Sequence, residues 1–454
     1  MVSLVKKISE NPLGANYNSF NSDDGFAAGM ETTILLTTIT KIGSLMKVGF
    51  GEAGASVIAK NLANATGGKL NLLDAGMMIN SIFGFCDVRQ FTDTTECLQE
   101  EVMFFVNRIA YILHNIVVQC NGAANKNIGD AFLLTWKVGE NLNKAEIALL
   151  ADQALLAFCK SLIELSKNQE FICNFSVAAT ARLYKRFPNY AVRIGSGLHY
   201  GWAVEGAIGS NRKIDASYLS PHVCFTEFLE SSTKEYGVPL LISESFFVLL
   251  SDEAKKYCRQ VDRVRRTPEE EPEGLFTYDS DIYIDWDNFK ARRKSHAAVN
   301  KRKVSVDVSN VPKSRTGRGS VITSSNAAVV EPDVEVGKEV KDPNIPPVIE
   351  VAKYTEDVWM TDLELIELRH KAPERLLNLW KEGITAYMAG NWSRAIEVFK
   401  ETQVMTAEKD HETGEVSEKD YDGPSRFLLN YMAGFHGKAP DDWHGYRSEG
   451  EGGH

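Results

Sequence analysis

The chain has 454 residues, enough for two or three domains, and its 44% hydrophobic residues are sufficient for ordinary globular cores. Its net charge of −11 argues against a general nucleic-acid-binding protein, which would present a basic surface. Seven cysteines without a CxxC pair favour a reduced compartment over a disulfide framework. Because neither a signal peptide nor an uninterrupted apolar run of about 18 residues is evident, we expect a cytoplasmic protein without a membrane span.

Two segments precede the first expected strand. Residues 1–30 are rich in Asn, Ser, Gly and Asp and predict a flexible arm. Residues 31–74 predict an amphipathic helical segment, because apolar residues recur there at three- and four-residue spacings. This segment could pack on the domain that follows, or it could dimerise or transmit a signal.

Residues 75–285 combine strand and helix signals and predict one α+β domain. The expected elements are, in chain order, a strand at 81–88, a helix at 98–120, a hairpin that turns at 127–130, a helix at 143–167, two strands around a glycine turn at 191–209, a helix near 221–236 and a strand near 238–243. Their β-α-β-β-α-β order is that of a ferredoxin-like unit, with an antiparallel or mixed sheet and flanking helices.

A linker at 286–352 follows, basic at first and then acidic. Between positions 288 and 318 it holds ten Lys or Arg against one acidic residue, so we expect it to be disordered or bound to a partner. Ser295 and Ser305 follow basic residues and are candidate sites for a basophilic kinase, whose phosphate would cut the positive charge. The linker could instead bind an acidic partner surface or serve only as a tether.

The C-terminal part, 353–447, predicts a small all-helical region that ends in a polar tail at 448–454. Residues 380–399 resemble one tetratricopeptide (TPR) unit, with Trp380 and Phe399 near the expected positions. A single unit cannot bury its own apolar face. We therefore expect this TPR-like region to pack on the central domain or on a protein partner, with a plain helical cap as the alternative.

Two aspartates of the central domain point to metal chemistry. Asp87 ends the first expected strand, and Asp130 lies in the tight hairpin turn. Adjacent antiparallel strands could bring both carboxylates to one end of the sheet, where they would bind Mg²⁺ together with a triphosphate. Two such ions can stabilise both the attacking and the leaving oxygen of a phosphoryl displacement. The alternative is a pair of ordinary solvated aspartates.

The strings around these aspartates carry a resemblance. FGFCDVRQFTDTT, NKNIGDAF, VRIGSGLHYGWAVEGAIGS and DASYLSPHV occur in this order. Together they resemble the motifs of class III adenylate and guanylate cyclases, and the last is similar to a variant common in protist cyclases. The resemblance spans roughly 210 residues and implies the class III cyclase fold.

The resemblance also implies roles for individual residues. Asp87 and Asp130, with the carbonyl of Val88, match the ligands of a two-metal site for Mg²⁺ or Mn²⁺. Lys126 and Asp215 match the pair that reads adenine, which favours ATP as the nucleotide. The loop over the triphosphate corresponds to Phe85, Cys86, Phe91 and Thr92.

Two positions depart from the family pattern. Cys224 stands where the family has the Asn that orients the ribose, and Phe228 stands where it has the Arg that stabilises transition-state charge. Such an Arg is worth about 10³–10⁵ in rate, and one positioned donor about 10²–10³. Neither replacement is a strong donor. No complete catalytic set is therefore present. Arg266 is a candidate substitute for the family's phosphate-binding Lys.

The family forms head-to-tail dimers, in which each site takes metal aspartates from one chain and Asn and Arg from the other. A homodimer of this chain would hold two defective sites. We therefore interpret the chain as a catalytically impaired pseudo-cyclase, an interaction subunit of a larger assembly such as a ciliary or cytoskeletal one. The alternative is an adenylate cyclase, forming cAMP and pyrophosphate, that is active only as a heterodimer. Protein partners would bind through the C-terminal helices and the basic linker.

Overall fold

The computed structural model describes residues 76–210, 213–291, 349–407 and 421–448, with the isolated residues 49, 51 and 54. Several of the expected segments lie outside the described residues. They are the arm at 1–30, nearly all of segment 31–74, most of linker 286–352 with Ser295 and Ser305, and most of the tail. The chain forms two compact units, Met1–Ile282 with Val348–His454, and Tyr283–Pro347. Of the second unit, residues 283–291 are described, and a helix begins at residue 286.

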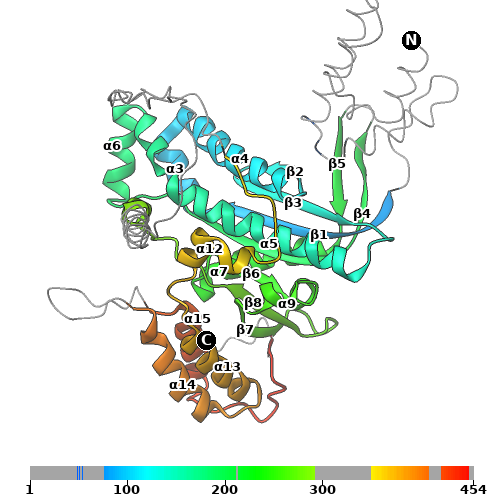
Figure 1. Ribbon diagram of the computed structural model, residues 1–454, viewed down its shortest axis with the longest axis vertical. Coiled ribbons are helices and arrows are strands. Elements are labelled where there is room, and N and C mark those ends of the chain that lie inside the picture. The colour runs from blue at the N-terminus through cyan, green and yellow to red at the C-terminus, as the bar shows by residue number, and fades with distance from the viewer. Residues whose placement is uncertain are drawn as a thin grey trace, which may run out of the picture. The chain divides into compact units, whose positions relative to one another are not determined.

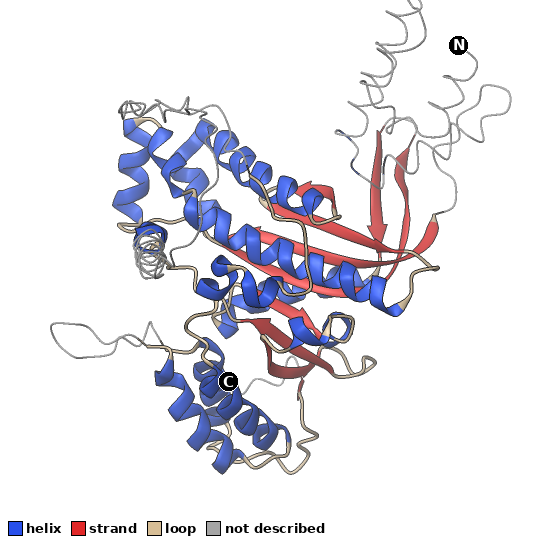
Figure 2. Cartoon of the chain, viewed as in Figure 1, coloured by secondary structure: helices blue, strands red, loops and turns tan. Residues whose placement is uncertain are grey.

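Nine strands of the described chain form one mixed sheet (Figures 1 and 2). They are β1 (Met77–Val88), β2 (Ala123–Ile128), β3 (Ala131–Val138), β4 (Ile194–Ser210), β5 (Lys213–Leu219), β6 (Leu240–Ser243), β7 (Cys258–Arg265), β8 (Glu273–Tyr278) and β9 (Arg447–Ser448). The order is β2-β3-β1-β4-β6-β8-β7-β9, and β5 pairs with β4. The first strand lies between β3 and β4 and is antiparallel to both. The α+β expectation is confirmed.

Helices cover both faces of this sheet. They are α3 (Phe91–Leu98), α4 (Val102–Gln119), α5 (Lys144–Lys167), α6 (Val177–Arg186), α7 (Pro221–Tyr236), α8 (Glu244–Phe247) and α9 (Asp252–Lys255), with 3-10 turns η2 (Gln99–Glu101) and η3 (Gln169–Asn174). Side chains alternate along a strand. A Cβ at Gly84 would meet the ring of Phe158 on α5, whereas Phe83 and Phe85 join a cluster with Val223 of α7. The helices α5 and α7 therefore lie on opposite faces.

The main helices match the expected ones because their local signals are strong. The N-terminus of α5 has a capping box in which Asn143 accepts from the backbone N–H of Glu146 and Glu146 accepts from that of Asn143. Among the described residues, the helical stretch Phe91–Gln119 is long and apolar enough to cross a membrane by length and composition, a test that core helices also pass. The residues of α4 that face α5 and the sheet are buried.

The expectation for 191–209 was wrong, because this segment is not two strands around a glycine turn. It belongs to a single strand, β4, which pairs with β5 beyond Ser210. Its glycines provide room instead of a turn: a Cβ at Gly197 would lie 2.4 Å from the carbonyl oxygen of Thr226, and one at Gly201 would lie 2.2 Å from the ring of His222. Helix α7 thus packs directly on the backbone of β4. The strands β7 and β8 were not anticipated.

Chain beyond residue 348 packs on the central domain and adds helices α11 (Val358–Thr361), α12 (Leu363–Leu368), α13 (Glu374–Met388), α14 (Trp392–Met405) and α15 (Gly423–Gly434). Residues 349–351 bond to Gln119 of α4. Lys160 of α5 pairs with Asp362 and Glu364 at 2.6 and 3.0 Å. The buried indole of Trp380 donates to the carbonyl of Gln260 on β7 at 2.6 Å. The expected packing on the central domain is confirmed, while the TPR likeness stays a prediction.

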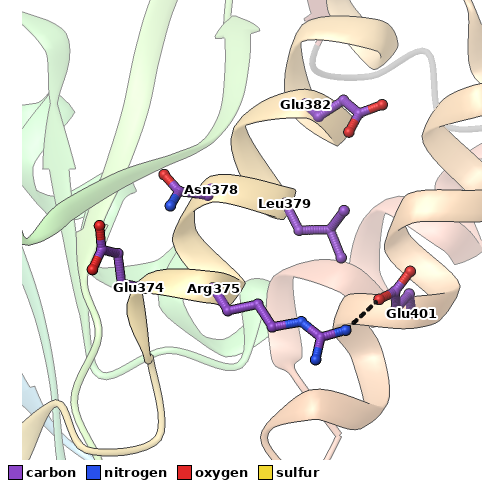
Figure 3. Close-up of a pocket in the computed structure, with 6 residues that line it drawn as sticks. All are labelled: Glu374, Arg375, Asn378, Leu379, Glu382 and Glu401. Atoms are coloured by element: carbon purple, nitrogen blue, oxygen red, sulfur yellow. Dashed lines mark hydrogen bonds and ion pairs between the residues drawn. The ribbon is translucent and has the colours of Figure 1, made fainter.

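An open pocket lies on α13 and α14 of this extension (Figure 3). It is lined by Glu374, Arg375, Asn378, Leu379, Glu382 and Glu401. Arg375 pairs with Glu401 across it at 3.3 Å. None of the residues expected to bind metal or nucleotide lines this pocket, so it is separate from the site described next.

Candidate functional site

Asp87 and Asp130 meet at one end of the sheet. Asp87 is the penultimate residue of β1 and pairs with Ala131, the residue that directly follows Asp130. Gly129 in the turn adopts φ of 65°, a conformation that glycine accepts without cost. The two carboxylates interact: burial and the charge of Asp87 raise the pKa of Asp130 to about 6.

A third carboxylate and an arginine lie next to this pair. Arg89 forms an ion pair with Glu230 of α7 at 2.9 Å and also donates to the hydroxyl of Thr233. Burial raises the pKa of Glu230 against the effect of Arg89, and the charges of Asp87 and Asp130 add to the rise. The end of β1 therefore gathers three carboxylates, with Arg89 and Lys234 as nearby cations.

This charge distribution fits a divalent cation. In the described part of the chain, no group of three or more His, Cys, Asp or Glu side chains is placed to hold a metal. Mg²⁺ commonly uses one or two carboxylates, with waters and substrate phosphates completing its shell. Asp87 and Asp130 are such a pair, and Val88 next to Asp87 supplies a backbone carbonyl on the same strand. A cation there would oppose both the burial and the charge of Asp87, which together raise the pKa of Asp130.

The four residues expected over the triphosphate fall into two groups. Phe85 and Cys86 are buried in the core of the sheet, and burial raises the pKa of the Cys86 thiol to about 12. Their side chains therefore serve packing. Phe91 and Thr92 begin α3, and Thr92 is exposed. The first turn of α3 is thus the accessible part of this segment, and helix N-termini favour anions.

Lys126 and Asp215, expected to read adenine, form an ion pair. Lys126 lies on β2 and Asp215 on β5, with β3, β1 and β4 between these strands in the sheet. The two side chains can meet only because the sheet curls over the cluster that contains Phe83 and Tyr218. They are 32% and 47% exposed, so a planar base could reach both.

The face of α7 that departs from the family pattern is accessible. Cys224 is exposed, and Phe228 lies one turn further along the helix and is partly exposed. Phe228 packs against Phe225 with ring centroids 5.6 Å apart. The guanidinium of Arg266, the residue that follows β7, lies 5.6 Å from the centroid of the Phe228 ring. A cation is therefore present beside Phe228, although it comes from another element.

Two features of this region were missed from the sequence. Buried His199 bonds to Ser243 and to His222, both at 2.7 Å, and His222 lies near the N-terminus of α7. Glu270 binds the guanidinium of Arg266 with both oxygens, at 3.0 and 2.5 Å. The four-residue spacing of Arg266 and Glu270 is a weak signal that could have indicated the second feature.

Comparisons with known proteins bear on two parts of the chain. Residues 1–63 match the family described as RasGEFs all helical domain, a stretch of which the structure describes three residues. Over 180 residues the chain is 27% identical to the protein named Adenylate cyclase of Anabaena cylindrica. That alignment covers 39% of this chain and 32% of the relative, so the chain spans about a third of the relative's length.

Several solved structures are similar to about half of the chain. A bacterial light-regulated adenylyl cyclase shares 21% identity, with 56% of this chain and 66% of that chain covered and a TM-score of 0.41. The adenylyl cyclase CyaB from P. aeruginosa shares 16%, covering 44% and 93%, with a TM-score of 0.33. The guanylate cyclase domain of RhGC from Catenaria anguillulae, in complex with GTP, shares 17%, covering 44% and 96%, with a TM-score of 0.34.

Proposed function

We propose that the stretch from Met77 to Tyr278 forms a class III nucleotidyl cyclase domain and that the chain is a cyclase-homology subunit in cyclic-nucleotide signalling. It binds ATP with a divalent cation but does not turn it over as a homodimer. It acts mainly through its interaction with a second cyclase domain and with a larger assembly. This proposal concerns the chain as a whole, which the matched relative covers only in part.

The observation that carries the proposal is the composition of the α7 face. The two positions that would hold Asn and Arg are Cys224 and Phe228, and both are accessible. A phenyl ring cannot donate a hydrogen bond to a phosphate, and a thiol donates weakly. Loss of the arginine alone corresponds to about 10³–10⁵ in rate. A homodimer would carry this loss in both of its sites.

Retained nucleotide binding is supported by the opposite half of the domain. The carboxylates of Asp87 and Asp130 lie together at the end of β1, and Lys126 and Asp215 lie together within reach of a base. Since these four residues are intact while the replaced positions, Cys224 and Phe228, lie on α7, nucleotide binding can persist while turnover is lost.

A heterodimeric adenylate cyclase is the second candidate, favoured by the intact aspartate pair. In such a dimer this chain would supply Asp87 and Asp130, and the partner would supply Asn and Arg. One site would work and the other would be degenerate. Exposed apolar side chains on β1, β4 and β5 support contact with a second domain, among them Met78, Trp202 and Leu219.

Cyclic AMP formation from Mn–ATP tests both candidates. We expect the full chain alone to be inactive. The partner in the second assay is a cyclase domain that keeps Asn and Arg but has both metal aspartates changed to Ala. Activity of the mixture that is lost with Asp87→Ala would establish the heterodimer. Turnover by the chain alone would contradict the pseudo-cyclase proposal, and a non-cyclisable ATP analogue that fails to bind with Mn²⁺ would contradict retained nucleotide binding.

The register of α7 can be tested directly. The double change Cys224→Asn and Phe228→Arg should raise activity of the homodimer if these residues occupy the two catalytic positions. The change Glu227→Arg is the matched control, since Glu227 is an exposed residue of the same helix. A ciliary or cytoskeletal location stays a prediction, and fluorescence microscopy of the tagged full chain would test it.

A further inference from the structure

Arg266 is held beside Phe228 by two kinds of contact. Its guanidinium lies 4.5 Å from the ring centroid of Phe225 and 5.6 Å from that of Phe228, both on α7. Its Nε and Nη2 atoms donate to the two oxygens of Glu270, at 3.0 and 2.5 Å. The rings fix the position of the cation, while the carboxylate occupies two of its donors.

We infer that Arg266 is the phosphate-binding cation of the α7 face. In the unliganded protein the carboxylate of Glu270 accepts the guanidinium hydrogen bonds that a polyphosphate would otherwise accept. The inference rests on the proposed function and adds a regulation to the same site. Guanidinium groups bind carboxylate and phosphate with the same bidentate geometry. One ligand must therefore leave before the other binds. Glu270 is the internal competitor of the nucleotide's phosphates.

The pair is suited to such exchange. Glu270 is 36% exposed and lies four residues after Arg266, and partly exposed ion pairs of this kind are weak. A polyphosphate carries several negative charges, so it can displace a single carboxylate. The guanidinium would stay in place, because the rings of Phe225 and Phe228 hold it when Glu270 leaves. Phe228 then acts as a platform for a cation that α7 itself no longer supplies.

The surroundings of the pair are mixed in charge. Glu269 and Glu271 are exposed neighbours in the same turn between β7 and β8 and oppose the approach of anions. His222 is half-buried on α7 within electrostatic range of both members of the pair, and burial and Arg266 lower the pKa of His222. A neutral His222 leaves Arg266 as the cation that faces this part of α7. The effect of Glu270 is therefore expected to exceed that of Glu269, which does not contact the guanidinium.

The alternative is an ion pair that only stabilises the turn. Both readings predict that Glu270→Gln leaves a folded protein, since Gln keeps the shape of the side chain. The two interpretations differ in the anion affinity that they predict for this variant. If the pair is only structural, its loss changes the melting temperature and leaves anion affinity as in the wild type. If it closes a site, its loss raises the affinity.

Isothermal titration of the full chain with tripolyphosphate in EDTA tests the inference without any metal. We expect Glu270→Gln to tighten binding about two- to fivefold, because the ligand then no longer has to break an exposed ion pair. Arg266→Ala should weaken it about tenfold or more, because charge-assisted bonds are lost. Arg266→Lys should fall between, since it keeps the charge without the fork. The matched control is Glu269→Gln, with less than half the effect of Glu270→Gln.

Equal effects of Glu269→Gln and Glu270→Gln would overturn the inference, because they would indicate general charge repulsion. Unchanged affinity in Arg266→Ala, or no binding by both the wild type and Glu270→Gln, would overturn it as well. The proposed function fails separately. Loss of Mn-dependent binding of the ATP analogue would contradict the proposed function, whereas the metal-free titration reports only on Arg266 and Glu270.

Discussion

Arg259 of β7 forms a buried ion pair with Asp422, whose Oδ1 lies 2.5 Å from Nη2 of the arginine, at the N-terminus of α15. Asp279 binds the same guanidinium at 2.7 Å. The C-terminal helices are thus joined to the central sheet by a charge cluster away from solvent. The extension and the central domain share one interior, which has consequences for stability.

Asp422→Ala should destabilise the whole protein. The change leaves Arg259 buried with one partner and removes the cap of α15, and breaking a buried pair costs about 3–5 kcal/mol. Urea unfolding followed by fluorescence measures the loss. Glu401→Ala, which breaks the exposed pair with Arg375, is the control and should have little effect. Equal effects would mean that the buried cluster is no more important than the surface pair.

Gly423 sets how closely α15 approaches α7. A Cβ there would lie 2.2 Å from the carbonyl oxygen of Tyr236 and 2.9 Å from that of Gly237, and backbone atoms cannot move aside singly. We expect Gly423→Ala to cost about 1–3 kcal/mol, as overpacking does. Gly434→Ala, at the other end of α15 with no atom within 4 Å, should be neutral. Thermal unfolding of both variants checks this, and a neutral Gly423→Ala would refute the close packing.

Stability should fall on mild acidification because of His199. Burial, with His222 and Arg266, lowers the pKa of His199 to about 3. Below about pH 6.5 the unfolded state binds a proton that the folded state does not, so the free energy of unfolding decreases as pH falls. The loss between pH 7 and pH 5 should be about 2 kcal/mol. Urea unfolding at both values measures it.

The variant His199→Gln should show a smaller loss between these two pH values, whatever its stability at pH 7. His444→Gln is the control, since His444 is exposed. A pH dependence unchanged in His199→Gln would show that other groups cause the acid sensitivity.

Mn²⁺ should stabilise the protein through Asp87 and Asp130. At a concentration a hundredfold above its dissociation constant, a ligand specific for the folded state contributes about 2.7 kcal/mol. In Asp87→Asn the metal effect should vanish. The metal-free variant should be no less stable than the wild type, because removing one charge lowers the pKa of Asp130 and ends their repulsion. Thermal melts of both proteins with and without Mn²⁺ measure this. Stabilisation by Mn²⁺ that persists in Asp87→Asn would contradict a metal site at Asp87 and Asp130.

Lys126 should set the preference for adenine. The proposed contacts are a bond from Lys126 to the ring and one from the exocyclic amine to Asp215. Lys126→Ala should reduce the preference for a non-cyclisable ATP analogue over its GTP counterpart about tenfold. Competition binding measures the ratio. Lys137→Ala, which breaks a pair with Glu205 on another part of the sheet, is the control and should leave the ratio unchanged.

Much of the architecture could be predicted from local pattern. The helices α4, α5 and α7 and the hairpin of β2 and β3 carry clear periodicity, caps or turn residues, so their positions followed from short windows. The segment 191–209 was misread because glycine marks both turns and close approaches. Only the neighbour, α7, distinguishes these, and a neighbour is not visible in a short window.

The sequence by itself determined which chemical groups are available: two aspartates at a strand end and a turn, a Lys and Asp for a base, and Cys224 and Phe228 in place of donors. These assignments depend on order and spacing along the chain. Tertiary structure alone decided that Arg266 lies beside Phe228 and that Asp422 shares a buried cluster with Arg259. Such contacts join residues from separate elements, and their partners are set by how the sheet and helices pack rather than by any local pattern.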